Sequence, residues 1–219
     1  MRKFLLLAVM LLGAVSVAYA GPTEFEFLGF TDGNWQLGYP YYITPGPASF
    51  IQAVMCDDYL HGGSVGETWE ANVTDLGSNN VSLTRFGHME SALGLAYYHQ
   101  AGWILLETVT EPMGQWMDMN EAVWHIFDPS SPIDAGGLAW LAAAQAEARL
   151  GFPGVDFNKV YIITPVNQYD PNDNDIQEFM YIGNDPSSSG SPGAATPEPA
   201  SLALLGTGAL GLFGRKYLS

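Results

Sequence analysis

Two short apolar segments, one at each end, most constrain what this chain of 219 residues can fold into. Residues 4–17 and 200–213 each run for 14 residues without a charged side chain. A membrane-spanning helix needs about 17–25 apolar residues, so both runs are short for a span. We interpret them as export and anchoring segments. This leaves residues 21–183 as one folded domain, followed by a Ser-, Gly- and Pro-rich linker over 184–196.

The N-terminal segment has the three parts of a secretory signal in the right order. Arg2 and Lys3 precede the apolar run, and the small residues Ala18 and Ala20 follow it. This arrangement is typical of a signal peptide, whose apolar region is shorter than a membrane anchor. We expect signal peptidase to remove residues 1–20 from the exported chain.

The C-terminal segment has polar residues on both sides of its apolar run. Pro197, Glu198 and Pro199 come before the run, and Arg215 and Lys216 come after it. At about 1.5 Å per residue the run reaches about 21 Å as a helix, against about 30 Å of hydrocarbon, and basic side chains at its end reach the headgroups. We expect an apolar anchor helix within residues 197–219, with its basic end on the cytoplasmic side.

These C-terminal elements together resemble the PEP-CTERM sorting signal of Gram-negative bacteria. The resemblance covers only residues 197–219. It implies that an exosortase recognises the signal in the inner membrane and removes the tail. The precursor would then be anchored in the inner membrane, and the product would reach the cell surface or an exopolysaccharide matrix.

The part of the chain between the end segments is strongly acidic. It holds all 23 acidic residues but only 3 of the 7 basic ones (Arg85, Arg149 and Lys159), so its formal charge is −20. Such a surface repels nucleic acid and anionic lipid. We therefore expect no nucleic-acid partner, and membrane contact only through the C-terminal segment. Divalent cations and neutral glycans, including exopolysaccharide, are compatible partners.

The apolar periodicity changes twice within the folded domain. Strand-like patterns occur at residues 24–27, 49–55, 69–73, 160–164 and 178–182. Helical spacing occurs in between, at about 89–104, 111–128 and 136–150. This order predicts a single α+β domain, an antiparallel β sheet or sandwich with an inserted helical segment.

Cys56 is the single cysteine, so the domain forms no internal disulfide and must be stabilised by packing. It lies in Met55-Cys56-Asp57-Asp58, and the second predicted helix carries Asn120-Glu121-Ala122-Val123-Trp124. The two segments resemble the surface thioester domains of bacterial adhesins and related PEP-CTERM proteins. In those domains a Cys followed closely by an Asp condenses with the Gln of a helical Gln-x-Ala-Ile-Trp motif.

This resemblance implies Cys56 and Asn120 as the candidate thioester pair. However, Asn120 is one methylene shorter than the expected Gln, and Gln115 lies about 140° away around the helix. We therefore expect Cys56 to be a small buried residue and Asn120 a hydrogen-bonded core amide, with the strand of Cys56 packed on this helix. A reactive thioester is the alternative.

An acidic stretch near the end of the domain has oxygen ligands at spacings that suit calcium. Its candidate ligands are Asp170, Asp173 and Asp175. An EF-hand loop would need Gly at the sixth position and Glu at the twelfth, where Asp175 and Tyr181 stand. We interpret the stretch as a solvated loop, with a calcium site of looser geometry as the alternative, and we expect no other cofactor.

The sequence contains no nucleophile-elbow motif and no pair of histidines at the spacing of a helical zinc site. We predict a protein that is not an enzyme and acts by binding or structural interaction. Two alternatives stay open: a thioester adhesin that uses Cys56, and a matrix-associated hydrolase. The hydrolase would require paired carboxylates at a cleft.

Overall fold

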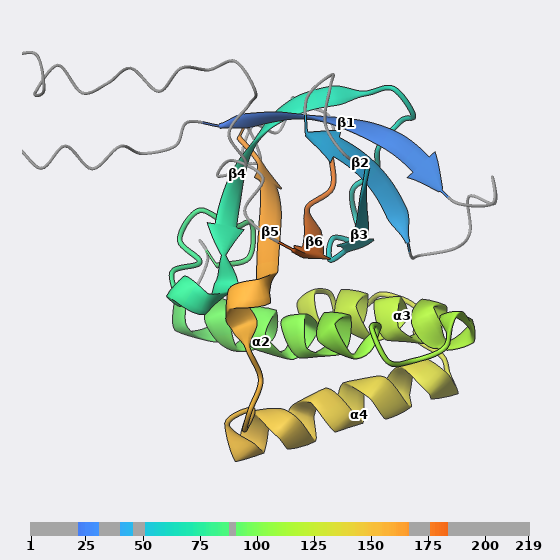
Figure 1. Ribbon diagram of the computed structural model, residues 1–219. Coiled ribbons are helices and arrows are strands. Elements are labelled where there is room, and N and C mark those ends of the chain that lie inside the picture. The colour runs from blue at the N-terminus through green and yellow to red at the C-terminus, as the bar shows by residue number, and fades with distance from the viewer. Residues whose placement is uncertain (1–21, 31–39, 46–50, 88–90, 167–175, 184–219) are drawn as a thin grey trace, which may run out of the picture. The chain divides into compact units, whose positions relative to one another are not determined.

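The computed structural model describes residues 22–30, 40–45, 51–87, 91–166 and 176–183 (Figure 1). The predicted signal peptide, linker, sorting segment and calcium loop lie outside these ranges. Within them, no helix has the length and apolarity to cross a membrane. The structure therefore reports on the predicted folded domain.

Six strands form a closed antiparallel barrel in the order β1-β2-β3-β6-β5-β4. They are β1 (Thr23–Phe30), β2 (Tyr41–Pro45), β3 (Gln52–Cys56), β4 (Thr68–Asp75), β5 (Val160–Pro165) and β6 (Phe179–Ile182). The α+β class and the antiparallel sheet confirm the prediction. The sheet closes into a barrel, a closure that the prediction did not specify.

β1 closes the barrel because it pairs with strands on both of its sides. Its first half pairs with β4 over Thr23–Glu26, and β2 pairs with it from Phe25 to Phe30. The register shifts between Phe27 and Gly29, and Gly29 has φ 101°. A bulge of this kind bends a strand and increases its twist, which brings the two sheet edges together.

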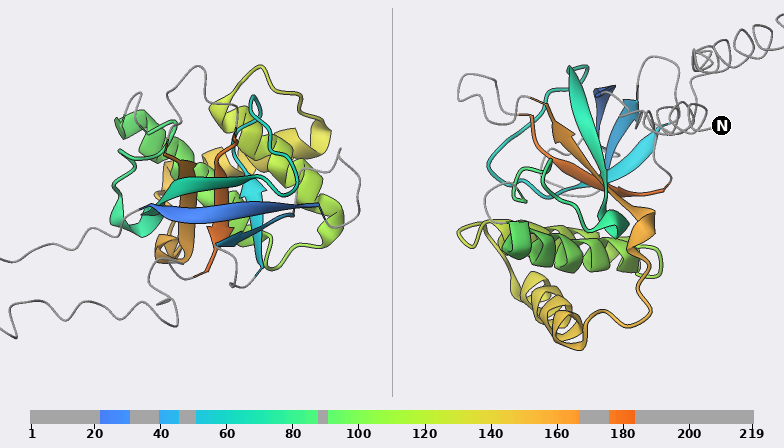
Figure 2. Two further views of the ribbon diagram at one scale, coloured as in Figure 1. Left: turned by 90° about the horizontal axis from the view of Figure 1, so that it is seen from above. Right: turned by 90° about the vertical axis from the view of Figure 1, so that its left-hand side faces the viewer.

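Three α-helices are inserted between β4 and β5 and lie against one end of the barrel (Figures 1 and 2). They are α2 (Ser91–Glu107), α3 (Trp116–Phe127) and α4 (Ala135–Leu150). The connections contain 3-10 turns at Leu76–Ser78, Met113–Gln115 and Phe157–Lys159. The predicted inserted helical segment is thus confirmed, with α2 and α3 next to the barrel and α4 outside them.

The helix ends follow local sequence signals. Asp134 caps α4 by accepting hydrogen bonds from the amides of Gly136 and Gly137, and Gly151 ends it with φ 76°. Side-chain capping and a left-handed glycine are the usual helix start and stop signals. In contrast, α3 begins at Trp116, five residues later than the predicted start, because a 3-10 turn occupies Met113–Gln115.

Strands β3, β5 and β6 have apolar residues on both faces. Cys56, Ile163 and Phe179 face the barrel interior, whereas Met55 and Met180 belong to the core shared with the helices. Successive strand residues point to opposite faces, so a strand between two cores is apolar throughout. This explains the continuous apolar runs and places Cys56 at the boundary between the two cores.

Candidate functional site

Several buried polar residues of the domain converge where β3 ends and β6 begins. Cys56 is the last residue of β3 and pairs with Phe179 of β6. Asp57 follows, and its amide donates to the main-chain oxygen of Glu178 at 3.4 Å. Apolar strands thus carry Cys56, two aspartates and Glu178 into one buried region.

The Cys56 thiol is buried and hydrogen-bonded. Its Sγ lies 3.1 Å from both the main-chain oxygen of Asp58 and Oε1 of Gln177, and the single thiol proton can be donated to either. The Asp58 amide donates to Sγ at 3.3 Å. Burial first, and the neighbouring Asp57 second, raise the pKa of the thiol well above its usual range, while Trp124 and Arg85 act in the opposite direction. The structure therefore favours a neutral thiol.

Asn120 lies on the buried face of α3, and its Nδ2 donates to the main-chain oxygen of Cys56 at 3.1 Å. This confirms that the strand of Cys56 packs on the helix of Asn120. The amide contacts the Cys56 main chain, however, and the amide that contacts the thiol is that of Gln177. Sequence reasoning missed Gln177, because only the pairing of β3 with β6 brings it to Cys56.

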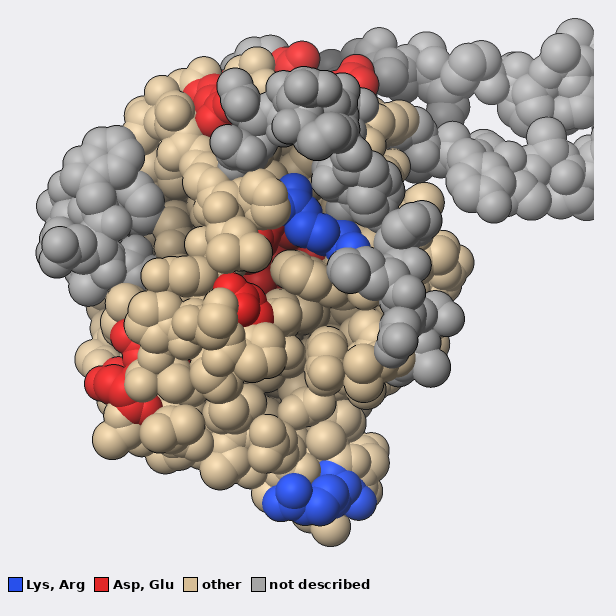
Figure 3. Space-filling model, turned by 180° about the vertical axis from the view of Figure 1, so that it is seen from behind, with Lys and Arg blue, Asp and Glu red and all other residues tan. Residues whose placement is uncertain are grey.

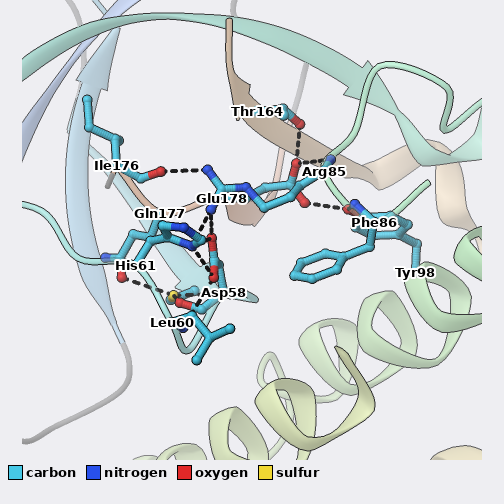
Figure 4. A network of polar contacts seen from close by, with 11 residues as sticks. Asp58, Leu60, His61, Arg85, Phe86, Tyr98, Thr164, Ile176, Gln177 and Glu178 are labelled. Carbon is cyan, nitrogen blue, oxygen red and sulfur yellow. Dashed lines mark hydrogen bonds and ion pairs between the residues drawn. The ribbon is translucent and has the colours of Figure 1, made fainter. Parts of the chain in front are cut away.

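A second cluster joins Asp58, His61 and Arg85 on the outer side of Cys56 (Figure 4). Asp58 is 2% exposed and forms an ion pair with Arg85, and His61 Nδ1 lies 2.7 and 2.8 Å from its two carboxylate oxygens. Arg85 also donates to the main-chain oxygen of Ile176 at 2.8 Å. The sequence places Asp58 and His61 three positions apart, but only the fold brings Arg85 to them.

Glu178 is fully buried and connects four parts of the fold. Its carboxylate accepts hydrogen bonds from the Arg85 amide at 2.8 Å and from the hydroxyls of Tyr98 and Thr164 (Figure 4). These donors come from α2, β5 and the segment before α2. Three donors stabilise a buried carboxylate, so Glu178 holds the barrel and the helices together.

Asp57 is also fully buried, but neither of its side-chain oxygens accepts a hydrogen bond from a donor in the described part of the chain. The residue opposite it is Glu178, one position beyond the Cys56–Phe179 pair of β3 and β6. Burial first, and Glu178 second, raise the pKa of Asp57 well above its usual range. Both influences favour the protonated form of the Asp57 side chain.

The other predicted site residues are not placed by the structure. The candidate calcium ligands Asp170, Asp173 and Asp175 lie outside the described residues, as do all of the predicted processing residues. Among the residues that are described, no group of three His, Cys, Asp or Glu side chains is arranged to hold a metal ion. Calcium binding by the 170–175 loop therefore stays a prediction.

Comparison with known proteins identifies one end of the chain clearly. Residues 195–216 match the family model of the PEP-CTERM protein-sorting motif, which confirms the predicted sorting signal. A comparison with curated protein sequences finds no match.

A comparison with solved structures finds the N-terminal thioester domain of a surface protein from Clostridium perfringens. The TM-score is 0.43 and the identity 12%, over 73% of this chain and 98% of that chain. A similarity at this level assigns no function, and the chemistry of the site rests on the geometry above.

Proposed function

We propose that this chain, which ends in a PEP-CTERM sorting motif, is delivered to the cell surface or extracellular matrix of a Gram-negative bacterium. We further propose that its folded domain acts there by binding or structural interaction. The observation that carries the proposal is the motif at residues 195–216, which implies export and exosortase processing. Exopolysaccharide or other surface components are the proposed partners.

The chemistry of the polar site supports interaction over catalysis. Asp57 and Glu178 are paired carboxyl groups, as a hydrolase would need, but both are 0% exposed. Cys56 is 1% exposed and its thiol pKa is raised. Groups buried to this degree do not reach a dissolved substrate, and their hydrogen bonds join the barrel to the helices.

The charge of the domain supports a neutral partner. On the face in Figure 3, Lys and Arg atoms form two small separate patches and most of the surface is uncharged. The exported part carries 23 acidic and 3 basic residues. A protein with this balance is repelled by polyanions, so neutral glycans or protein surfaces fit better than nucleic acid or anionic lipid.

Intact mass of protein recovered from the native cell surface tests the proposal. We expect a chain that begins at Gly21 and lacks Arg215 and Lys216. Glu198→Ala should leave the precursor in the inner membrane, while Asp185→Ala, which removes a carboxylate from the linker, should be delivered normally. Surface protein that still carries the basic pair, or equal delivery of both variants, would contradict exosortase processing.

A thioester adhesin is the second candidate, and the contact of Cys56 Sγ with Gln177 Oε1 at 3.1 Å favours it. Attack of sulfur on an amide carbon would form an S–C bond and break the C–N bond. The thiol proton would leave with the amide nitrogen as ammonia. Among the described residues, Gln177 contacts the Cys56 thiol and Asn120 contacts the Cys56 main-chain oxygen, so these two amides are the candidate acyl donors.

A further inference from the structure

Asp57 and Glu178 are two fully buried carboxyl groups that meet across β3 and β6. Both residues are 0% exposed, and their backbones are hydrogen-bonded at 3.4 Å. One position beyond the Cys56–Phe179 pair, the register places Asp57 directly opposite Glu178, with both side chains on the same face of the sheet. Two adjacent buried carboxylates cannot both be ionised without a large electrostatic penalty, so one of the two must hold a proton.

The hydrogen-bond donors around this pair all donate to the Glu178 carboxylate. Glu178 accepts from Arg85, Tyr98 and Thr164, whereas the Asp57 oxygens accept from no donor in the described residues. Donors stabilise the ionised form, which makes Glu178 the carboxylate. The proton therefore belongs to Asp57, whose O–H finds its acceptor in Glu178.

We propose that Asp57 is protonated in the native protein and donates a hydrogen bond to Glu178. This hydrogen bond is a pH-sensitive latch, because it joins β3 to β6 and depends on the proton of Asp57. The seam that it closes, the pairing of β3 with β6, has the fewest paired residues in the barrel. β3 pairs with β6 at two register positions, whereas the other neighbouring strands pair at three to five. Asp57 and Glu178 occupy the next position along this seam, where a second negative charge would repel the first.

Within the described ranges, the one cation that acts on Asp57 is already paired. The charged and titratable groups around Asp57 there are Glu178 just before β6, Arg85 from the segment before α2, Cys56 from β3 and Tyr98 from α2. Arg85 is already bound to Asp58 and to a main-chain oxygen of Ile176. Burial raises the pKa of both Cys56 and Tyr98 well above their usual ranges, so these two groups stay neutral.

The direction of the pH effect follows from the raised pKa of Asp57. The folded chain holds this proton more tightly than the unfolded chain does. The resulting stability is complete below the unfolded pKa and is lost as the pH rises through the folded pKa. The latch is therefore closed below the folded pKa of Asp57 and weakens as the pH rises above it.

Infrared spectroscopy of the full chain at neutral pH tests the proton. We expect the carbonyl stretch of a carboxylic acid, which should shift when Asp carboxyl carbons carry a heavy isotope and not when Glu carboxyl carbons do. Asp57→Asn should remove the signal, and Asp58→Asn should keep it because Asp58 is ion-paired. A missing acid signal, or one that follows the Glu label, would overturn the assignment without any need for a variant.

The reaction rate of Cys56 with a thiol reagent tests the latch. In Asp57→Asn the neutral amide still donates to Glu178 at every pH, so the rate should rise only with thiolate formation. In the wild type, the seam should also open above the folded pKa of Asp57. This opening should raise the reaction rate of Cys56 further, by as much as about tenfold per pH unit. Glu178→Gln should also lose this additional rise. A ratio of wild-type to Asp57→Asn rates that stays constant with pH would show that no latch operates.

Discussion

The side-chain amide of Asn120 donates a hydrogen bond of 3.1 Å to the main-chain oxygen of Cys56, and this bond ties α3 to the last residue of β3. Cys56 is buried, so its main-chain oxygen lies away from water. Buried carbonyls require hydrogen-bond partners. This explains why an amide occupies the apolar face of α3.

Replacement of Asn120 by Ala should therefore lower the free energy of unfolding by about 1–3 kcal/mol, because the Cys56 carbonyl loses its donor. Urea unfolding measures the loss. Gln145→Ala, which removes an exposed amide from α4, is the control and should change stability by no more than about 0.5 kcal/mol. Equal losses of stability in the two variants would show that the hydrogen bond between Asn120 and Cys56 does not stabilise the fold.

Tyr98→Phe removes one of the three donors to the Glu178 carboxylate. Hydrogen bonds to charged groups contribute about 1.5–3 kcal/mol, so a loss in this range is expected in thermal or urea unfolding. The neighbouring Tyr97→Phe is the matched control, because Tyr97 is only partly buried. If both variants lose the same stability, the buried network is not what joins α2 to the barrel.

Arg85→Met leaves the buried Asp58 carboxylate without its cation. Removing one partner of a buried ion pair destabilises by about 3–5 kcal/mol. The exposed pair of Lys159 and Asp156, at 3.7 Å, offers a comparison, and Lys159→Met should cost about 1 kcal/mol or less.

A double variant distinguishes loss of the ion pair from loss of packing. Asp58→Asn combined with Arg85→Met removes the unpaired charge, so the double variant should be more stable than the sum of the two single losses implies. Additive losses in urea unfolding would assign the role of Arg85 to packing instead.

Calcium binding by the 170–175 loop has its own test. If Asp170, Asp173 and Asp175 hold a cation, millimolar calcium should raise the melting temperature by mass action on the folded state. The rise should vanish in the Asp173→Ala, Asp175→Ala double variant. It should persist in a Glu70→Ala, Asp185→Ala variant, which loses the same charge elsewhere. Equal rises in all three proteins would indicate general screening of the acidic surface.

Local periodicity was sufficient to predict most of the elements of the fold. The runs that became β3, β5 and β6 are mostly apolar because both of their faces pack against a core, and helical spacing located α2 to α4. β2 was missed because Tyr41–Pro45 is short and flanked by Gly and Pro residues. Barrel closure was missed because it depends on the pairing of β1 with two partners, which no local pattern encodes.

The candidate site was predicted only where one motif specified it. The strand of Cys56 packs on the helix of Asn120 as predicted, but the Asn120 amide contacts the Cys56 main chain and not its thiol. Gln177, Glu178 and Tyr98 come from distant segments, and only the three-dimensional fold brings them together. Asp57 and Asp58 are adjacent in sequence but have opposite partners, since one faces Glu178 and the other Arg85.

The state of the Cys56 thiol decides between a structural role and a thioester. We expect an intact thiol, because burial and Asp57 raise its pKa and disfavour the attacking thiolate. Denatured, unreduced protein should therefore react with one equivalent of a thiol reagent and show its full expected mass. Cys56→Ser should lower stability by placing a hydroxyl in the barrel core while leaving surface attachment unchanged.

A missing thiol together with a mass deficit of one ammonia would make Cys56 the functional centre instead. The acyl donor would then be identified by two variants. Gln177→Ala would restore the thiol if the amide that contacts Sγ at 3.1 Å is the donor, and Asn120→Ala would restore it if the amide on α3 is. Because Asn120 contacts the main-chain oxygen of Cys56 and Gln177 contacts the sulfur, the geometry predicts that Gln177→Ala alone would do so.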